Sequence, residues 1–589
     1  MRSRTTIFLS SALALSLAAC GGGNFNSGSV PGESQPLVVT AGAATLDVLP
    51  NATPATLNLT VTRPAGDSGS ITFKATSLPA GVTAAYENPG IGNSGKVTFT
   101  VLGTAAGTYG ILIVASDTVA SGSAAVNLVV NALATVHPGA AGVFDTFVTT
   151  SFQPAEFSDA FFREHPAATD GLNQLGGRHM RIQAISQDIP QKTAATWDFS
   201  RLDGVVTPVL SVTDHSPEFQ IAFAPSFMYT TSGALRDTTY SEFAGYAANL
   251  VRYYNTGGFT DGSGVRHASP SPFPIRFWGI YNEPNINGIS ALEYARLYNA
   301  TVPAMQAADP TVQFVAVELA DFGAEAQKTM PQFVASVKAR VDIVGTHYYS
   351  SCNRNDSDQM LLNTAPQFAA SVSYIYAQLK TNPALAAAPV WVTENNVNAD
   401  YDKGGGISAC NGGKFVADQR GTSAFFAAWR PYVYSQLGKA GARALYHWDY
   451  YSDAQYGEVD QRTASPYLSY WVDYWLSRYL GDSPGTILPL DNTDSATEEI
   501  LAVKKSDGST VIMIANHAVK AASDNDGAGA SRTVNLDVSA LGPLRSATRL
   551  TIDASTGLKT GPAETALTVA PAMKISLPGY GVTFLRFVP

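Results

Sequence analysis

The sequence predicts a mixed α/β protein in which a (β/α)₈ barrel is flanked by two β-sandwiches. Short apolar segments alternate with amphipathic helical segments between residues 137 and 480. Segments in which apolar and polar side chains alternate with a period of two precede and follow that region. The chain has 589 residues, which is enough for about two to four domains.

The first 20 residues have the pattern of an export signal. Two arginines precede an apolar stretch from Ile7 to Ala19, which is short for a membrane span. The following Cys20, with three glycines after it, resembles the acylated cysteine of a bacterial lipoprotein. We expect a lipid-anchored protein of the bacterial cell envelope with a flexible tether over residues 21–34; an ordinary signal peptide is the alternative.

Residues 35–134 are expected to form an immunoglobulin-like β-sandwich. Apolar and polar side chains alternate over residues 57–62, 71–75 and 96–101, and turn residues separate these runs. The segment resembles bacterial immunoglobulin-like modules. Its role as a spacer or as a glycan-binding module is left open.

The region from 137 to 480 has the pattern of a parallel barrel. Its expected strands are apolar throughout, as strands buried on both faces are, and helical segments such as 241–255 and 292–307 lie between them. The expected strands are 179–185, 220–225, 275–281, 312–319, 343–349, 390–393 and 444–448.

The helical pattern stops after residue 480, and residues 486–589 alternate again as a second β-sandwich. The net charge of −10 is spread along the chain without a basic cluster. Nucleic-acid binding depends on such clusters, so we expect no nucleic-acid partner.

Two glutamates end two of the expected barrel strands. Residues 276–281 run into Asn282-Glu283-Pro284, and residues 390–393 run directly into Glu394. The glutamates are 111 positions apart, or about three units of roughly 40 residues, which suits strands 4 and 7. Because reacting residues in this fold lie at the C-terminal ends of strands, we expect the two side chains to face each other.

Two facing carboxyl groups suit the cleavage of a glycosidic bond. One protonates the leaving oxygen, and the other, at about 5.5 Å, attacks the anomeric carbon and gives net retention. The aromatic neighbours Trp278, Tyr281 and Trp391 are expected to stack on sugar rings. For either glutamate alone, a structural carboxylate is the alternative.

These two segments resemble the acid/base and nucleophile strands of clan A glycoside hydrolases. Within the clan the chain is most similar to family 39, which contains β-xylosidases, α-L-iduronidases and bacterial exopolysaccharide hydrolases. The segments that carry the family resemblance are 197–203, 219–225, 294–310, 346–349 and 446–453.

The resemblance implies a role for each matching residue. Glu283 would be the acid/base and Glu394 the nucleophile. Asn282 would bind the sugar 2-hydroxyl, and Arg181 would keep the nucleophile ionised, with a structural salt bridge as the alternative. The remaining implied substrate-binding residues are His347 and Tyr349, which would flank the nucleophile, and Trp448, which would form the floor of the sugar subsite.

Two positions depart from the family pattern. Gln183 stands where the xylosidases carry a histidine, and the loop with Glu458 lacks their acidic pair. Both positions would contact the sugar, so the departures concern specificity. The expected function is a retaining glycosidase acting on an oligo- or polysaccharide, without cofactor or metal; an exo-acting xylosidase-like enzyme and a non-catalytic surface carbohydrate-binding protein are the alternatives.

The remaining cysteines suggest a disulfide. With Cys20 lipidated, Cys352 and Cys410 are left in loops of an exported protein, where disulfides persist. We expect them to pair, which would join the loops after strands 6 and 7; two free thiols are the alternative.

Overall fold

The computed structural model describes residues 36–50, 54–102, 104, 106–153, 161–184, 189–321 and 323–589. The predicted signal, Cys20 and the tether over residues 21–34 lie outside these residues. The chain divides into two compact units, of which the second holds Val129–Pro589 and two short earlier segments, Asp47–Thr53 and Val101–Thr108. In the described part of the chain, no helix combines the length and apolar character needed to cross a bilayer.

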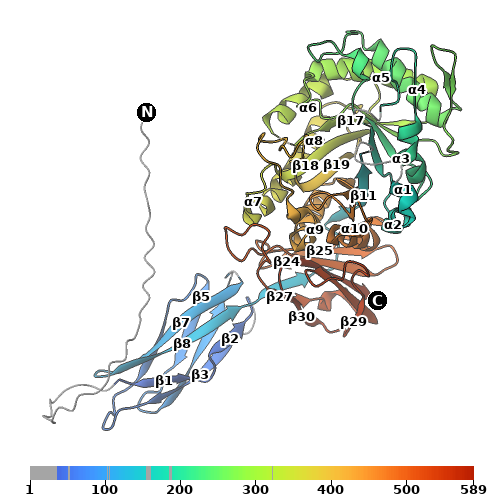
Figure 1. Cartoon of the computed structure of the whole chain (residues 1–589). Helices are drawn as coiled ribbons and strands as arrows, with labels where there is room; N and C mark the ends of the chain where they lie inside the picture. The colour runs from blue at the N-terminus through green and yellow to red at the C-terminus, as the bar shows by residue number, and fades with distance from the viewer. Residues whose placement is uncertain are drawn as a thin grey trace, which may run out of the picture. The chain divides into compact units, whose positions relative to one another are not determined.

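The first unit is built from two four-stranded sheets, which are drawn in blue in Figure 1. In β3 (Ala55–Thr62) every second side chain is buried, which explains why the sequence shows a period of two. One sheet has the order β1 (Val38–Ala41), β3, β6 (Ser94–Val101), β5 (Val82–Glu87), and the other the order β2 (Thr45–Val48), β8 (Ser121–Val130), β7 (Gly107–Ser116), β4 (Thr72–Thr76).

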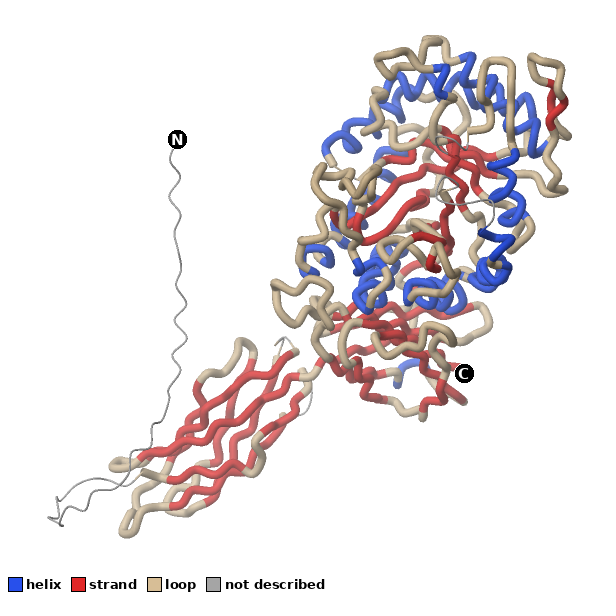
Figure 2. Tube along the Cα trace, in the orientation of Figure 1, coloured by secondary structure: helices blue, strands red, loops and turns tan. Residues whose placement is uncertain are grey.

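The second unit contains a closed barrel of eight parallel strands, which confirms the predicted fold class. Helices surround the strands (Figure 2). Seven of the eight strands overlap the predicted segments, and β11 was not predicted. The barrel order is β11 (Phe147–Phe152), β12 (Arg181–Ala184), β13 (Glu218–Ile221), β16 (Phe277–Ile280), β17 (Gln313–Leu319), β18 (Ile343–Ser351), β19 (Val390–Asn398) and β20 (Ala444–His447).

The helices bury one face against the barrel. The helix α5 (Ala291–Ala308) begins at a capping box, in which Ser290 accepts from the backbone of Glu293 and the Glu293 side chain accepts from the backbone of Ser290. The other α-helices are α1 (Phe161–Glu164), α2 (Pro166–Leu175), α3 (Ser200–Leu210), α4 (Ser241–Asn255), α6 (Ala324–Ser336), α7 (Asp358–Leu362), α8 (Ala365–Leu379), α9 (Ala424–Lys439) and α10 (Leu468–Leu476).

The C-terminal sandwich takes two strands from before the barrel, which the sequence did not predict. Its sheets have the orders β10-β23-β25-β26-β31-β28-β29 and β24-β9-β27-β30. The strand β9 (Ala132–Val136) pairs with β24 (Leu490–Asn492) and β27 (Arg532–Asp537). Ala134 and Val136 are fully buried in the sandwich core, so residues 132–136 belong to this sandwich and not to the predicted N-terminal one.

The other strands of the sandwich complete the two sheets. β10 (Gly142–Phe144) pairs with β23 (Gly485–Ile487), so the barrel segment proper starts later than the predicted residue 137. The remaining strands are β25 (Glu498–Lys505), β26 (Thr510–Asn516), β28 (Ser546–Asp553), β29 (Thr565–Leu567), β30 (Ala572–Leu577) and β31 (Gly581–Val588).

Cys352 and Cys410 form a disulfide with their Cα atoms 6.0 Å apart, which confirms the predicted pairing. Cys352 directly follows β18, and Cys410 lies in the loop after β19. The bond therefore joins the loops that follow two neighbouring barrel strands on the side where those strands end.

Candidate active site

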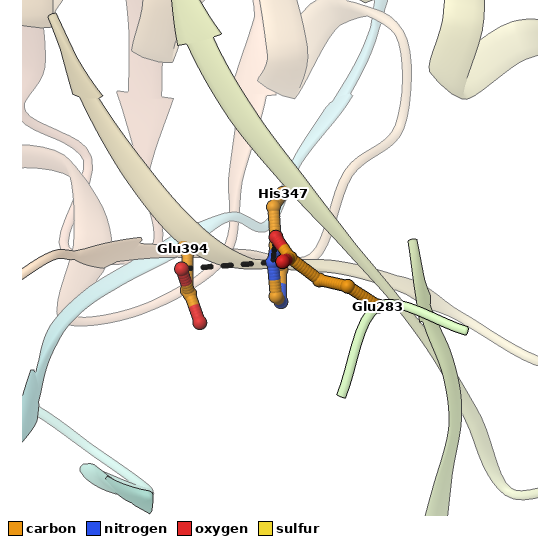
Figure 3. Close-up of side chains that lie close together, drawn as sticks. All are labelled: Glu283, His347 and Glu394. Carbon is orange, nitrogen blue, oxygen red and sulfur yellow. Dashed lines mark hydrogen bonds and ion pairs between the residues drawn. The ribbon is translucent and has the colours of Figure 1, made fainter. Parts of the chain in front are cut away.

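Glu283 and Glu394 lie at the C-terminal ends of two barrel strands. Glu394 is part of β19, and Glu283 follows β16 by three residues. His347, on β18, lies between them (Figure 3). One carboxylate oxygen of each glutamate and a ring nitrogen of His347 all lie within 4.8 Å of one another, so the structure brings together the two carboxyl groups that the sequence singled out.

The backbone around both glutamates departs from regular strand geometry. The φ angles of Tyr281 and Glu283 are +67° and +46°, a region that side-chain-bearing residues seldom occupy. The register between β18 and β19 shifts between Thr346 and His347, and the shift places His347 opposite Glu394. Such strain and bulges are typical of functional sites because they aim particular side chains.

Hydrogen-bond donors surround the Glu394 carboxylate. Arg181 Nη1 lies 3.0 Å and Gln183 Nε2 3.2 Å from its Oε1 atom, and the Tyr349 hydroxyl donates to its Oε2 atom at 2.8 Å. One of these three donors, Arg181, is a cation and is fully buried beside the carboxylate. Charge-assisted hydrogen bonds of this kind are short and strong, so they fix the position of the carboxylate.

His347 contacts three carboxylates. Its Nδ1 atom lies 2.7 Å from Glu283 Oε1 and 3.6 Å from Glu394 Oε2, and its Nε2 atom lies 3.0 Å from Glu318 Oε2. Burial alone would lower the pKa of His347, but Glu394, Glu283 and Glu318 together raise it to about 9. The imidazole is therefore a cation at neutral pH, with both N–H groups donating.

Two side-chain amides position Asn282. Its Oδ1 atom accepts from Gln220 Nε2 at 2.9 Å and from Gln183 Nε2 at 3.2 Å, and Gln183 also donates to Gln220 Oε1 at 2.7 Å. With its oxygen occupied, Asn282 has its amide N–H groups left for a ligand. Gln183 thus links Asn282 to Glu394, because it also donates to the Glu394 carboxylate.

Trp448 and Glu458 occupy different environments. Trp448 follows β20, and the Arg181 guanidinium carbon lies 5.7 Å from the centre of its ring. Glu458 is fully buried, and its carboxylate groups with His447 and Asp473 instead of with Glu283 and Glu394. Burial raises the pKa of Glu458 well above its usual range. Its burial speaks against the predicted contact with substrate.

Two of the predicted stacking aromatics face away from the site. Trp278 is fully buried in the main core, where its indole N–H donates to the carbonyl oxygen of Ile275. Trp391 belongs to a separate apolar cluster with Phe147 and Tyr446. The expectation that Trp278 and Trp391 stack on sugars is wrong, because strand residues alternate in direction and only the strand ends reach the site.

Three buried polar residues of the barrel interior were missed by the sequence reasoning. Glu218 and Gln220 lie on β13, and Glu318 lies near the end of β17. A charged residue near the end of an apolar strand is the same signal that identified Glu394, so Glu318 was open to prediction. Glu218 begins its strand, so that rule does not apply to it.

Comparison with known proteins gives one family match in sequence. The description of the matching family is alpha-L-arabinofuranosidase 1 domain, and the match spans residues 213–367, which include Glu283, Glu318 and His347. No curated protein matches the chain in sequence.

Solved structures share the architecture at low sequence identity. A glycoside hydrolase family 39 β-xylosidase from Caulobacter crescentus is 16% identical with a TM-score of 0.50, over 78% of this chain and all of that one. A glucosidase from Croceicoccus marinus is 14% identical with a TM-score of 0.49, over 78% and 99%. A family 44 endoglucanase from Clostridium thermocellum is 11% identical with a TM-score of 0.48, over 77% and 99%.

The first of these structures supports the fold, and the family match supports the class of reaction. The closed barrel carries both glutamates at its strand ends, and the match to an arabinofuranosidase domain covers the segment that holds Glu283. The chain is therefore a glycosidase whose fold is that of a family 39 β-xylosidase.

Proposed function

We propose that the chain is a retaining glycoside hydrolase that cleaves an oligo- or polysaccharide by double displacement, with Glu283 as acid/base and Glu394 as nucleophile. The observation that carries this proposal is the proximity of the two carboxylates, whose oxygens come within 4.8 Å. Retaining enzymes hold their carboxyl groups about 5 to 5.5 Å apart, whereas inverting enzymes need a wider gap to admit a water molecule.

In the first step, a Glu394 oxygen attacks the anomeric carbon while Glu283 gives its proton to the leaving glycosidic oxygen. The bond between sugar and leaving group breaks, and a covalent glycosyl–enzyme ester forms. In the second step, Glu283 takes a proton from a water molecule that attacks the same carbon. The ester bond breaks, Glu394 leaves as a carboxylate, and the product has the starting configuration.

The surrounding residues support these steps. Arg181 and the Tyr349 hydroxyl bind the Glu394 carboxylate and hold it in place. Asn282 supports the transition state, because a hydrogen bond to the sugar 2-hydroxyl strengthens as positive charge develops on the ring. Trp448 offers an aromatic face next to Arg181.

The same three side chains could be read as a metal site, because their ligand atoms lie within 4.8 Å of one another. A histidine binds a metal ion through a neutral ring nitrogen. The carboxylates around His347 raise its pKa to about 9, so its ring carries protons on both nitrogens at neutral pH. A metal ion at this position would have to displace the Nδ1 proton that bonds to Glu283, so the hydrogen-bonded arrangement suits carboxylate chemistry.

The test is hydrolysis of a panel of aryl β-xylosides, β-glucosides and α-L-arabinofuranosides by the wild type and by Glu283→Gln and Glu394→Gln. We expect both variants to lose activity, and Glu283→Gln to keep more of it on dinitrophenyl glycosides, whose leaving group needs no proton. Proton NMR of the first product should show the retained anomer. An inverted first product would refute the mechanism, and an inactive wild type would favour the non-catalytic carbohydrate-binding alternative.

The cellular location is a separate proposal. We propose that Cys20 is acylated and holds the enzyme at the bacterial cell envelope, which suits a polymeric substrate outside the cytoplasm. Mass spectrometry of the N-terminal peptide from the expressing bacterium should show a diacylglyceryl group on Cys20. Recovery of Cys20→Ala in the membrane fraction to the same extent as the wild type would contradict the anchor.

A further inference from the structure

A third glutamate, Glu318, lies beneath the pair that is proposed to react. It is fully buried near the end of β17. Its Oε2 atom accepts from Thr393 Oγ1 at 2.6 Å and from His347 Nε2 at 3.0 Å, and lies 3.5 Å from Arg181 Nη2. One carboxylate oxygen therefore joins the two cations that contact Glu283 and Glu394.

The barrel interior is shaped around Glu318. A Cβ atom on Gly345 of β18 would lie 2.8 Å from the Glu318 carboxyl carbon, which is closer than packed atoms come. The φ angles of Val317 and Glu318 are +77° and +47°, at a register shift between β17 and β18. A β-branched residue at positive φ is a true outlier, so the fold holds this carboxylate in place against local strain.

In the proposed mechanism, Glu318 is the carboxylate that balances the charge of His347. The two cations that contact the reacting pair are Arg181 and His347, and the attacking carboxylate of Glu394 compensates one of them. When Glu283 holds the proton that it will donate, Glu318 is the carboxylate that compensates the other. An arginine does not lose its proton in a protein, so without the charge of Glu318 the buried excess proton would leave from His347.

Glu218, which is also fully buried, lies 3.8 Å from Arg181 Nε, and its pKa is shifted in the opposite direction to that of Glu318. Burial and the charge of Glu318 raise the pKa of Glu218 well above its usual range. Burial would also raise the pKa of Glu318, but Arg181 and His347 lower it to about 2. Tyr446 on β20 also faces these carboxylates, and its own pKa is raised by burial and by their charges, so it adds no charge.

We propose that Glu318 is a positioning residue, which keeps His347 doubly protonated and oriented so that one imidazolium bridges the acid/base and the nucleophile. The inference rests on the proposed function and deepens it. The His347 Nδ1–H group, held in place by the Nε2–H bond to Glu318, donates to Glu283 at 2.7 Å and faces Glu394 at 3.6 Å. Glu318 itself acts only through His347 and Arg181.

The test compares Glu318→Gln with the matched variant Glu218→Gln. Both replace a buried interior carboxyl by an amide of the same shape, but only the first removes a charge. NMR titration of ¹³C-labelled histidine rings, with the His347 signal assigned from His347→Gln, reports the protonation of His347 without any substrate. We expect Glu318→Gln to lower the pKa of His347 by about one unit or more, and Glu218→Gln to leave it within a few tenths.

Kinetics supply the second readout. We expect Glu318→Gln to lower kcat at pH 8 by about 10- to 100-fold, to affect KM little, and to move the basic limb of the pH profile to lower pH. We expect Glu218→Gln to stay within about threefold of the wild type. Should Glu318→Gln fail to fold, Glu318→Asp, which keeps the charge but withdraws the carboxylate from His347 Nε2, should lower the pKa of His347 in the same direction by less.

Three results would overturn the inference: an unchanged pKa of His347 in Glu318→Gln, equal losses in Glu318→Gln and Glu218→Gln, or a fall in kcat without any shift of the pH profile. If no substrate is found for the wild type, the proposed function fails, but the NMR titration still decides whether Glu318 sets the charge of His347.

Discussion

Replacing Tyr349 by phenylalanine should isolate the contribution of one hydrogen bond to the proposed nucleophile. The Tyr349 hydroxyl donates to Glu394 Oε2 at 2.8 Å. The remaining cationic neighbour of that oxygen, His347 Nδ1, lies at 3.6 Å, beyond hydrogen-bond distance. The variant therefore leaves one oxygen of the attacking carboxylate without a close donor, while Arg181 still binds the other at 3.0 Å.

The size of the effect follows from the charge of the acceptor. A hydrogen bond to a charged group contributes about 1.5 to 3 kcal/mol. If this amount is lost from the transition state in which Glu394 attacks, kcat falls by about 10- to 150-fold, because each 1.4 kcal/mol changes a rate tenfold. The substrate does not contact this hydroxyl in the proposed mechanism, so we expect KM to change by less than about threefold.

The assay is steady-state hydrolysis of the best aryl glycoside, with Tyr348→Phe as the matched control. Tyr348 directly precedes Tyr349 on β18, and its hydroxyl forms hydrogen bonds with Thr364 and Ser350, away from the site. Its loss should leave kcat within about twofold. Equal kcat values for wild type and Tyr349→Phe, or equal losses in the two variants, would refute the assignment of Glu394 as the attacking group.

Two further predictions concern stability. Burial and the nearby Asp494 raise the pKa of Glu498 from its ordinary value to about 8, so folding favours its protonated form and this contribution is lost as the pH rises from about 4.5 to 8. Glu498→Gln should therefore raise the free energy of unfolding at pH 8, by up to about 4 kcal/mol, and change it little at pH 4. Thermal unfolding at both pH values checks this prediction. Equal shifts of the unfolding midpoint at the two pH values would contradict it. The disulfide closes a loop with a sequence separation of 58. The double variant Cys352→Ser and Cys410→Ser should therefore lose up to about 4 kcal/mol of unfolding free energy. Its thermal unfolding midpoint should be lower than that of the wild type, and a reducing agent should not lower it further.

Most of the barrel was predictable because its strands are locally apolar. The exception is β11, the sequence of which is Phe-Val-Thr-Thr-Ser-Phe. All six residues are buried, but the three in the middle, Thr149, Thr150 and Ser151, are polar. These residues interrupt the apolar run, so the composition of the strand resembles that of a loop.

The boundary of the C-terminal sandwich could not be predicted for a different reason. The strand β9 follows β8 after a single residue, and in the sequence it continues the alternation of the N-terminal module. Its partners β24 and β27 lie about 350 to 400 residues further along the chain. Alternation reveals that a segment is a strand, but the sheet that it joins depends on contacts that sequence patterns do not show.

In the candidate site, the position of a carboxylate is set by a single strand, whereas its charge is set by residues from several strands. Glu283 and Glu394 were found because each ends a strand, a feature that the local sequence carries. Whether a given carboxylate is ionised depends on the cations that other strands bring to it, and in this barrel Arg181 and His347 come from β12 and β18. Glu218 and Glu318 are the same residue type at full burial, yet burial and the charge of Glu318 raise the pKa of Glu218, whereas Arg181 and His347 lower the pKa of Glu318. The protonation pattern on which the chemistry depends is thus a property of the closed barrel, and no single segment of the sequence contains it.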